Sequence, residues 1–219
     1  MSDVSVSIII TCYNLGKYVS RAISSCVNQT IDERDYEIIV VDDCSTDNSW
    51  EIIQGFGSII KSFRHEQNKG VAAASNTGIE ASSGRYVVRV DADDFINKNF
   101  IQTMKEVLDY NEDIGFVYCD HIVVKENLER MFRLNTVERL LDHGAGIMFR
   151  RKNMVLLGGY SEKFRNREDY DLVLRYFKNF DGYHLRLPYY RYFKRDDGLS
   201  SDSEKRKKEK NEIDKRELI

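Results

Sequence analysis

Three apolar runs in the first half of the chain each end in a cluster of polar residues, and a helical pattern follows each cluster. The runs cover residues 4–11, 36–41 and 85–90. Apolar runs that alternate with helices are typical of parallel strands covered by helices on both faces. The pattern predicts an α/β fold whose polar loops meet at the carboxyl ends of the strands, the edge where such sheets bind ligands.

The second half of the chain has a less regular pattern. We expect strands over residues 114–119, 122–124, 147–150 and 183–193, and helices over residues 99–110 and 170–180. This order indicates a mixed α+β region that continues the parallel half. A length of 219 residues suits one large domain, which we place at residues 1–200.

Residues 201–219 form a tail of different composition. From Ser203 onward almost every side chain is Lys, Arg, Glu or Asp. Too few apolar residues remain to make a stripe that could pack on a core. We therefore expect a solvated helix or a disordered segment, whose basic residues would give at most weak attraction to an anionic membrane.

Composition excludes several classes of function. The formal net charge is −3 and 42% of the residues are hydrophobic, which is typical of a soluble globular protein. A negative net charge gives no general attraction to nucleic acid, so we expect no nucleic-acid partner. The first residues lack the basic region of a signal peptide, and no apolar run approaches the ~20 residues that span a bilayer. The sequence predicts a cytoplasmic location, either free or at the inner face of the membrane.

Three carboxylates follow the run at residues 85–90 directly. Asp91, Asp93 and Asp94 are so close in sequence that their charges repel unless a cation neutralises them. Mg²⁺ and Mn²⁺ prefer oxygen ligands, and Mg²⁺ commonly takes one or two carboxylates while phosphates and water fill its other positions. The cluster alone fits two interpretations, a divalent-cation site and a solvated acidic turn that caps the next helix.

Residues that suit a nucleotide are expected at the same edge of the sheet. Thr11, Tyr13 and Asn14 end the first run, and Asp42 and Asp43 end the second. An aromatic ring can stack on a base while a carboxylate accepts hydrogen bonds from the base or from a ribose hydroxyl. We therefore predict nucleotide binding here. Helix capping is the alternative, but it does not easily explain both aspartates.

Six short segments of the chain are distinctive when taken together. They are SIIITCYN, IIVVDDCSTDNS, NKGVAAASNTGI, SGRYVVRVDADD, GGY and REDYDLVLR. In order and approximate spacing they resemble glycosyltransferase family 2, over about residues 4–195. The resemblance implies a GT-A (nucleotide-diphospho-sugar transferase) fold, with a mainly parallel central sheet flanked by helices and a Rossmann-like N-terminal half. It also implies a donor-binding half at residues 1–95 and an acceptor-binding half at residues 96–200.

The resemblance implies roles for residues on the donor side. The positions of Tyr13 and Asp43 contact the base, that of Asp91 contacts the ribose, and Asn68 and Gly70 belong to a segment along the nucleotide. The position of Asp93 binds a divalent cation, Mn²⁺ or Mg²⁺, which Asp91 could also reach through water. The other donor-side candidates are Thr11, Asn14, Asp42 and Ala92.

The general base of the family lies in a Glu-Asp pair before a helix, which matches Glu168 and Asp169. Inverting transfer is a direct displacement at the anomeric carbon, so a carboxylate must take the proton of the acceptor hydroxyl as the bond forms. We predict this role for Asp169, with Glu168 beside it. Arg165 and Arg167 could favour its ionised form or contact phosphate. Capping of the following helix by Asp169 is the alternative, and it is compatible with catalysis.

Two departures from the family pattern and one weak match complete the candidates. Ser75 stands where the family often has Arg, immediately before Asn76. The family often has a His after a Tyr-rich strand, whereas this chain offers Lys194 or Arg195 to neutralise the leaving diphosphate. His143, in HGAGIMFRR, matches part of the acceptor side.

The sequence therefore predicts an inverting, metal-dependent glycosyltransferase of the hexosyltransferase class. The expected donor is a nucleotide-diphosphate sugar with uracil as its base. The expected acceptor is a hydroxyl of a glycan or lipid-linked molecule, in cell-surface polysaccharide or glycolipid synthesis. The alternative is a catalytically silent module that binds a sugar nucleotide or a glycan. An aspartyl phosphotransferase fits less well, because the Thr or Val expected two residues after the second Asp is replaced by Phe95.

Overall fold

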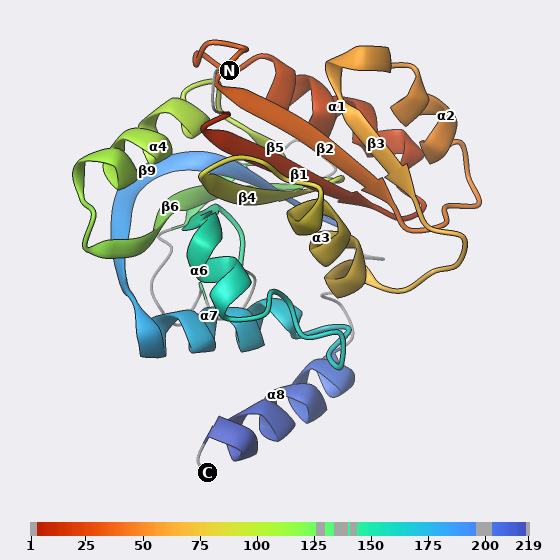
Figure 1. Cartoon of the computed structure of the whole chain (residues 1–219). Helices are drawn as coiled ribbons and strands as arrows, with labels where there is room; N and C mark the ends of the chain where they lie inside the picture. Colours follow the sequence, from red (N-terminus) through yellow and green to blue (C-terminus); the bar gives the residue numbers. More distant parts are fainter. Residues whose placement is uncertain (1–3, 126–129, 134–139, 141–143, 196–202, 218–219) are drawn as a thin grey trace.

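The computed structural model describes residues 4–125, 130–133, 140, 144–195 and 203–217. Nine strands in these ranges form one curved sheet (Figure 1). The strands are β1 (Val6–Cys12), β2 (Tyr36–Asp42), β3 (Lys61–Arg64), β4 (Tyr86–Asp91), β5 (Phe95–Ile96), β6 (Ile114–Lys125), β7 (Arg130–Arg133), β8 (Ile147–Arg150) and β9 (Asp181–Lys194). The helices are α1 (Gly16–Val27), α2 (Ser49–Gln54), the 3₁₀ helix η1 (Gly57–Ile59), α3 (Val71–Glu80), α4 (Phe100–Tyr110), α6 (Arg151–Leu156), α7 (Glu168–Asn179) and α8 (Ser203–Glu217).

The first half of the chain forms the parallel part of the sheet, as the sequence predicts. β3, β2, β1 and β4 lie side by side in that order, and every pair among them is parallel. The register pairs Thr11 with Asp91 and Cys12 with Asp42. The polar residues that end β1, β2 and β4 therefore lie at one edge of the sheet, although they are far apart in sequence.

The core has two layers, because alternate residues of a buried strand face opposite sides of the sheet. Ile8 and Ile10 pack in a cluster with buried residues of α1 and α4, whereas Ile9 packs with residues of α3 and α7. Figure 1 shows α1, α2 and α4 on one side of the sheet and α3, α6 and α7 on the other. Packing on both faces fixes the strand ends, and so fixes the starting points of the loops that follow them.

The second half adds antiparallel pairs to the sheet. β8 pairs antiparallel with both β4 and β6, and β9 runs parallel to β6 and antiparallel to β5. β6 is one continuous strand where the sequence suggests two, and its pairing with β9 shifts register around Cys119 and Asp120, where the extra residues lie on β9. The sequence does not predict β5, β7 and α6, which are too short to show a clear periodicity.

The tail forms α8, and this helix is not solvated on all sides. Ile213 is fully buried in a cluster with Phe164 and Tyr170, and Leu174 packs against that cluster. A single apolar residue on a charged helix gives no periodic signal, which explains why the sequence does not reveal the docking. In Figure 1, α8 lies below α7, at the end of the molecule away from α1 and α2. The described helices, α8 included, all lack the length and apolar character needed to cross a membrane.

Candidate active site

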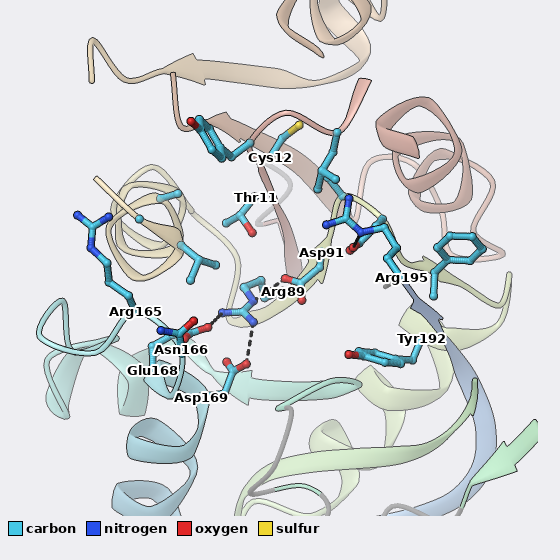
Figure 2. A pocket seen from close by; sticks show the side chains of 18 of the residues that line it. Thr11, Cys12, Arg89, Asp91, Arg165, Asn166, Glu168, Asp169, Tyr192 and Arg195 are labelled. Carbon is cyan, nitrogen blue, oxygen red and sulfur yellow. Dashed lines mark hydrogen bonds and ion pairs between the residues drawn. The ribbon is translucent and has the colours of Figure 1, made fainter. Parts of the chain in front are cut away.

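A cleft of about 1060 Å³ lies at the carboxyl ends of β1, β2 and β4. Its other wall comes from the start of α7 and the end of β9 (Figure 2). Most of the residues predicted from the sequence line this cleft. They are Thr11, Tyr13, Asn14, Asp43, Asn68, Gly70, Asp91, Ala92, Asp93, Arg167, Glu168, Asp169, Lys194 and Arg195.

Two predicted residues are not placed in the cleft. His143 lies outside the described residues. Asp42 is fully buried, and its Oδ2 accepts a hydrogen bond from the backbone N–H of Ser45 at 3.2 Å and lies 3.2 Å from Nε of Arg64. Neighbouring side chains at a strand end point to opposite faces, so Asp42 and Asp43 do not reach the cleft together. Asp42 is a structural residue of the turn, which corrects its assignment to the donor side.

The turn after β1 is tied to the turn after β2 by Asn14. Its φ of 52° is left-handed, a conformation that Asn adopts more readily than most residues. The Oδ1 atom of Asn14 accepts a hydrogen bond from the backbone N–H of Thr46 at 2.7 Å, and its own N–H donates to Oγ of Ser45 at 2.9 Å. These bonds fix the turn while the neighbouring Tyr13 remains 45% exposed, with its ring available for stacking in the cleft.

Asp43 anchors the segment that precedes α3. Its carboxylate accepts hydrogen bonds from the backbone N–H groups of Lys69 and Gly70, at 2.9 and 2.7 Å. It also lies 2.7 Å from Nδ1 of His65, whose Nε2 is 2.9 Å from the Thr77 hydroxyl. A carboxylate has about four acceptor sites, so three protein contacts leave room for one more from a ligand. The Gly70 φ of 94° explains the glycine at the point where the chain turns into α3.

Asp94 connects the acidic loop after β4 to β9. It is 1% exposed, and its Oδ1 accepts a hydrogen bond from the backbone N–H of Phe193 at 2.7 Å. Burial raises the pKa of Asp94 well above its ordinary value, and the charges of Asp93 and Asp91 raise it further. Asp94 is therefore a buried structural residue, and Asp91 and Asp93 are the two carboxylates of the loop that line the cleft.

Both of these carboxylates have an arginine beside them. Nε of Arg89 lies 3.0 Å from Oδ1 of Asp91, and Nε of Arg195 lies 3.1 Å from Oδ2 of Asp93. Burial, and next the charge of Asp91, nevertheless raise the pKa of Asp93 to about 6, so the nearby Arg195 does not fully offset these two effects.

These residues fit a divalent cation only in part. The described residues include no group of three or more His, Cys, Asp or Glu side chains that could bind a metal ion. A cation held by protein ligands alone is therefore not supported. The two carboxylates fit a hard cation that takes one or two of them and completes its shell with diphosphate oxygens and water.

Arg89 connects the acidic loop to a second acidic pair on α7. Its Nη1 lies 3.3 Å from Oε1 of Glu168, and its Nη2 donates a hydrogen bond to Oδ2 of Asp169 at 2.9 Å. Figure 2 shows the guanidinium group between Asp91 on one side and Glu168 and Asp169 on the other. A planar group with several donors suits such a bridge better than a lysine ammonium would.

Asp169 and Glu168 occupy the first turn of α7, where carboxylates interact favourably with the helix dipole. Burial raises the pKa of both groups; for Glu168 the charge of Asp169 adds to this, whereas for Asp169 the nearby Arg89 opposes it. The contact of Arg89 is shorter with Asp169, which makes Asp169 the more readily ionised member of the pair. A Cβ atom at Gly144 would lie 2.6 Å from Cβ of Asp169, so glycine is needed where that segment passes the acidic pair.

Some residues of the site have no counterpart in the sequence-based prediction. The main ones are Arg89, His65, Tyr192, Arg133 and Arg206. Arg89 did leave a signal, because a charged residue inside the apolar run YVVRVD needs a partner when the strand is buried. The others come from segments without a recognisable motif. Arg165, which the sequence places near the general base or a phosphate, lines the same cleft, and its Nη1 lies 3.5 Å from Oδ1 of Asn68.

Comparison with known proteins identifies the same segments. The model of the family "Glycosyl transferase family 2" matches residues 7–171. Glycosyltransferase GlyA of Streptococcus pneumoniae serotype 4 is 36% identical over 116 residues, which are 52% of this chain and 16% of that protein. The Escherichia coli protein WfgD, named UDP-Glc:alpha-D-GlcNAc-diphosphoundecaprenol beta-1,3-glucosyltransferase, is 32% identical over 185 residues, or 82% of this chain and 72% of that protein.

A solved structure shows the same fold. The S. aureus protein TarS, residues 1–349 in complex with UDP-GlcNAc, superimposes with a TM-score of 0.79 at 22% identity. The match covers 91% of this chain and 61% of that one. Its agreement with the curved, partly parallel sheet confirms the expected GT-A fold. The family model spans both the donor-side loops and the acidic pair of α7, and the chain belongs to glycosyltransferase family 2.

Proposed function

We propose that this chain transfers a sugar from a uridine-diphosphate donor to a hydroxyl group of a glycan or lipid-linked acceptor, with inversion at the anomeric carbon. The observation that supports this most directly is the composition of one cleft. It is lined by the strand-end residues expected to bind a donor and by a separate acidic pair on α7. A direct displacement needs these two parts on opposite sides of the reacting carbon.

The donor would lie along the ends of β1, β2 and β4. Tyr13 has an exposed ring for the base, and Asp43 has an acceptor site left for a base N–H. We assign Asp91 to the ribose and the Asn68–Gly70 segment to the length of the nucleotide. Two similar proteins support uracil, since the name of WfgD includes UDP-Glc and TarS was crystallised with UDP-GlcNAc.

We assign Asp93 as the protein ligand of Mn²⁺ or Mg²⁺, with Asp91 assisting through a water molecule. A bound cation would neutralise charge on the diphosphate as it leaves. Lys194 and Arg195 also line the cleft and add positive charge for the same group. The two carboxylates support this assignment, because both line the cleft and offer the oxygen ligands that a hard cation prefers.

Asp169 would act as the general base, taking the proton of the acceptor hydroxyl as oxygen attacks the anomeric carbon. Its contact with Arg89 favours the ionised form that a base requires. Burial also raises the pKa of Glu168. Near neutral pH the two carboxyl groups would therefore hold one proton between them. Arg167 lines the same part of the cleft and would contact the acceptor or its phosphate.

The proposed acceptor is based on the similar protein WfgD. The name of WfgD describes an acceptor in which a sugar is joined to undecaprenol through a diphosphate. The arginines that line the cleft beside the acidic pair suit an acceptor of that charge. This supports a place in cell-surface polysaccharide or glycolipid synthesis.

A thermal-shift screen with Mn²⁺ tests the donor. UDP-Glc and UDP-GlcNAc should raise the melting temperature more than GDP-mannose or dTDP-glucose, because a ligand that binds only the native state stabilises it. If GDP displaced a bound probe better than UDP, the assignment of uracil would be wrong.

A second measurement separates the enzyme from a silent module. Slow hydrolysis of the bound UDP-sugar, or transfer to a sugar-diphosphate lipid, should be measurable with the wild-type chain and much weaker with Asp169→Asn. Binding of the donor with neither reaction would indicate the catalytically silent module.

A further inference from the structure

α8 contacts the chain on both sides of Asp169. The residues that make these contacts recur every three or four positions and so share one face of the helix. They are Arg206, Glu209, Lys210, Ile213, Asp214 and Arg216. The sequence shows only a charged tail, but the structure makes this face a neighbour of the active site.

Before Asp169, Glu209 and Arg206 contact backbone groups, and the side-chain amide of Asn166 adds a longer hydrogen bond of 3.5 Å to Glu209. One carboxylate oxygen of Glu209 accepts a hydrogen bond from the N–H of Asn166 at 2.9 Å, and the other accepts one from the N–H of Arg165 at 3.4 Å. Nε of Arg167 donates to the carbonyl oxygen of Arg206 at 3.3 Å. Residues 165–167 belong to neither a helix nor a strand, so these bonds fix a segment that regular structure does not.

After Asp169, the contacts are to side chains. The hydroxyl of Tyr170 donates to Oδ1 of Asp214 at 2.6 Å. Arg216 forms an ion pair with Asp171, which is fully buried. Ile213 is also fully buried, where it packs with the ring of Tyr170. A shift of α8 would therefore move the first turn of α7, which includes Asp169.

We propose that α8 is a positioning element of the active site and that Glu209 is its positioning residue. By holding the backbone at Arg165 and Asn166, Glu209 sets where α7 begins, and thus where the Asp169 carboxylate meets Arg89. Arg206, one helical turn before Glu209, lines the cleft itself, so α8 reaches the site as well as supporting it. The role of Asp169 as base rests on the proposed function.

The test compares three single variants of the full chain. Glu209→Ala removes the acceptor of both backbone N–H groups, and Glu209→Gln keeps one carbonyl oxygen in place. Glu212→Ala changes an exposed residue of the same helix and serves as the matched control. We expect Glu209→Ala to lower kcat about 10- to 100-fold, as displacements of about 1 Å at an active site do. Glu209→Gln should recover most of that loss, Glu212→Ala should match the wild type, and the KM for the donor should change less than twofold in all three.

A double-mutant cycle shows whether Glu209 acts through Asp169. In the Asp169→Asn background, Glu209→Ala should lower kcat only slightly further, because the carboxylate that Glu209 positions is already lost. Equal losses of kcat in both backgrounds would overturn the proposal. So would a fall in melting temperature with unchanged kcat, since α8 would then only stabilise the fold.

Hydrogen exchange gives a readout that does not need the reaction. In Glu209→Ala, the amides of Arg165 and Asn166 should exchange faster, while those of β1 and β4 should not change. Unchanged exchange at these two amides would refute the positioning role. If wild-type protein neither binds nor consumes UDP-sugars, the proposed function fails. The exchange result still shows whether Glu209 holds the backbone at Arg165 and Asn166.

Discussion

Arg89 controls the charge of the acidic residues around it. It contacts Asp91, Glu168 and Asp169, and its side chain is only 10% exposed. Without this arginine the buried carboxyl group of Asp169 would be harder to ionise, because burial disfavours its charged form. The donor side and the acceptor side of the cleft are thus coupled through one guanidinium group.

Substitution of Arg89 should change the pH dependence of turnover. Burial raises the pKa of Asp169 to about 6, and Arg89 opposes that rise, so wild-type activity should fall as the pH drops through this region. Arg89→Met removes the opposing charge, the pKa of Asp169 rises further, and the midpoint of the acid limb should move up by roughly 1 to 3 pH units. Arg89→Lys, which keeps the charge, should move it less. Rate profiles from pH 5 to 9 on folded variants measure this, and identical midpoints would contradict it.

Asp169→Asn should lower kcat roughly 10²- to 10⁴-fold while the affinity for the donor stays within a few-fold of the wild type. Asn keeps the shape and the helix start but cannot accept the proton of the acceptor. Glu168→Gln is the matched change one residue earlier, and its effect should be smaller. Near-normal turnover by Asp169→Asn, or an α-linked product from an α-linked donor by NMR, would rule out both the base assignment and inversion.

The sequence predicts these residues unevenly, for physical reasons. Asp93 and Asp169 belong to motifs in which side chain and spacing together specify the chemistry. Asp42 and Asp43 are adjacent and of the same residue type, but only Asp43 lines the cleft, because the side chains of neighbouring residues in a strand point to opposite faces. The partner of Arg89 is 80 positions away at Asp169, and no local pattern reports such a contact.

Among the elements, the loop after β4 gives the sharpest test of the metal. Titration of UDP by calorimetry should show much weaker binding in EDTA than in Mn²⁺, and Asp93→Ala should lose the difference. Asp94→Asn is the matched control, because Asp94 directly follows Asp93 but is buried outside the cleft lining, and Asn has nearly the same shape. Equal affinities for UDP with and without EDTA would remove the cation from the proposed function.

Some helices and strands can be predicted from the sequence, whereas others become visible only in the folded chain. The parallel half of the sheet follows from the sequence, because long apolar runs and amphipathic helices such as α1 give strong periodic signals. β6 was predicted as two strands because Asp120 and His121 interrupt its apolar pattern, yet both are buried within it. The docking of α8 depends on charge pairs and one isoleucine, and their partners become visible only in the folded chain.

At the scale of the whole molecule, charge is distributed unevenly. The chain has a net charge of −3, but more basic than acidic side chains line the cleft. The basic ones are Arg89, Arg133, Arg165, Arg167, Lys194, Arg195 and Arg206, and the acidic ones are Asp43, Asp91, Asp93, Glu168 and Asp169. A cleft of this kind concentrates anionic ligands locally although the whole protein repels them. This agrees with a donor and an acceptor that both bear phosphate.

The docked position of α8 also defines which of its charges face outward. Lys205, Lys207, Lys208 and Lys215 are exposed, and Glu204 and Glu212 are exposed among them. Each basic residue near an anionic bilayer contributes about 1 kcal/mol, and each acidic residue offsets part of that. The helix therefore offers a small net positive surface, enough for weak binding at most.

Sedimentation with vesicles tests this surface. At low ionic strength, vesicles with anionic phospholipid should bring down more wild-type protein than a variant with all four exposed lysines changed to Gln. The difference should vanish in about 0.5 M salt, because screening shortens the range of exposed charges to a few ångströms. The buried face of α8 is untouched in the variant, so its melting temperature and kcat with a soluble acceptor should match the wild type. Equal sedimentation of the two proteins would show that the exposed lysines of α8 do not bind the membrane. The helix would then keep only its role beside the active site.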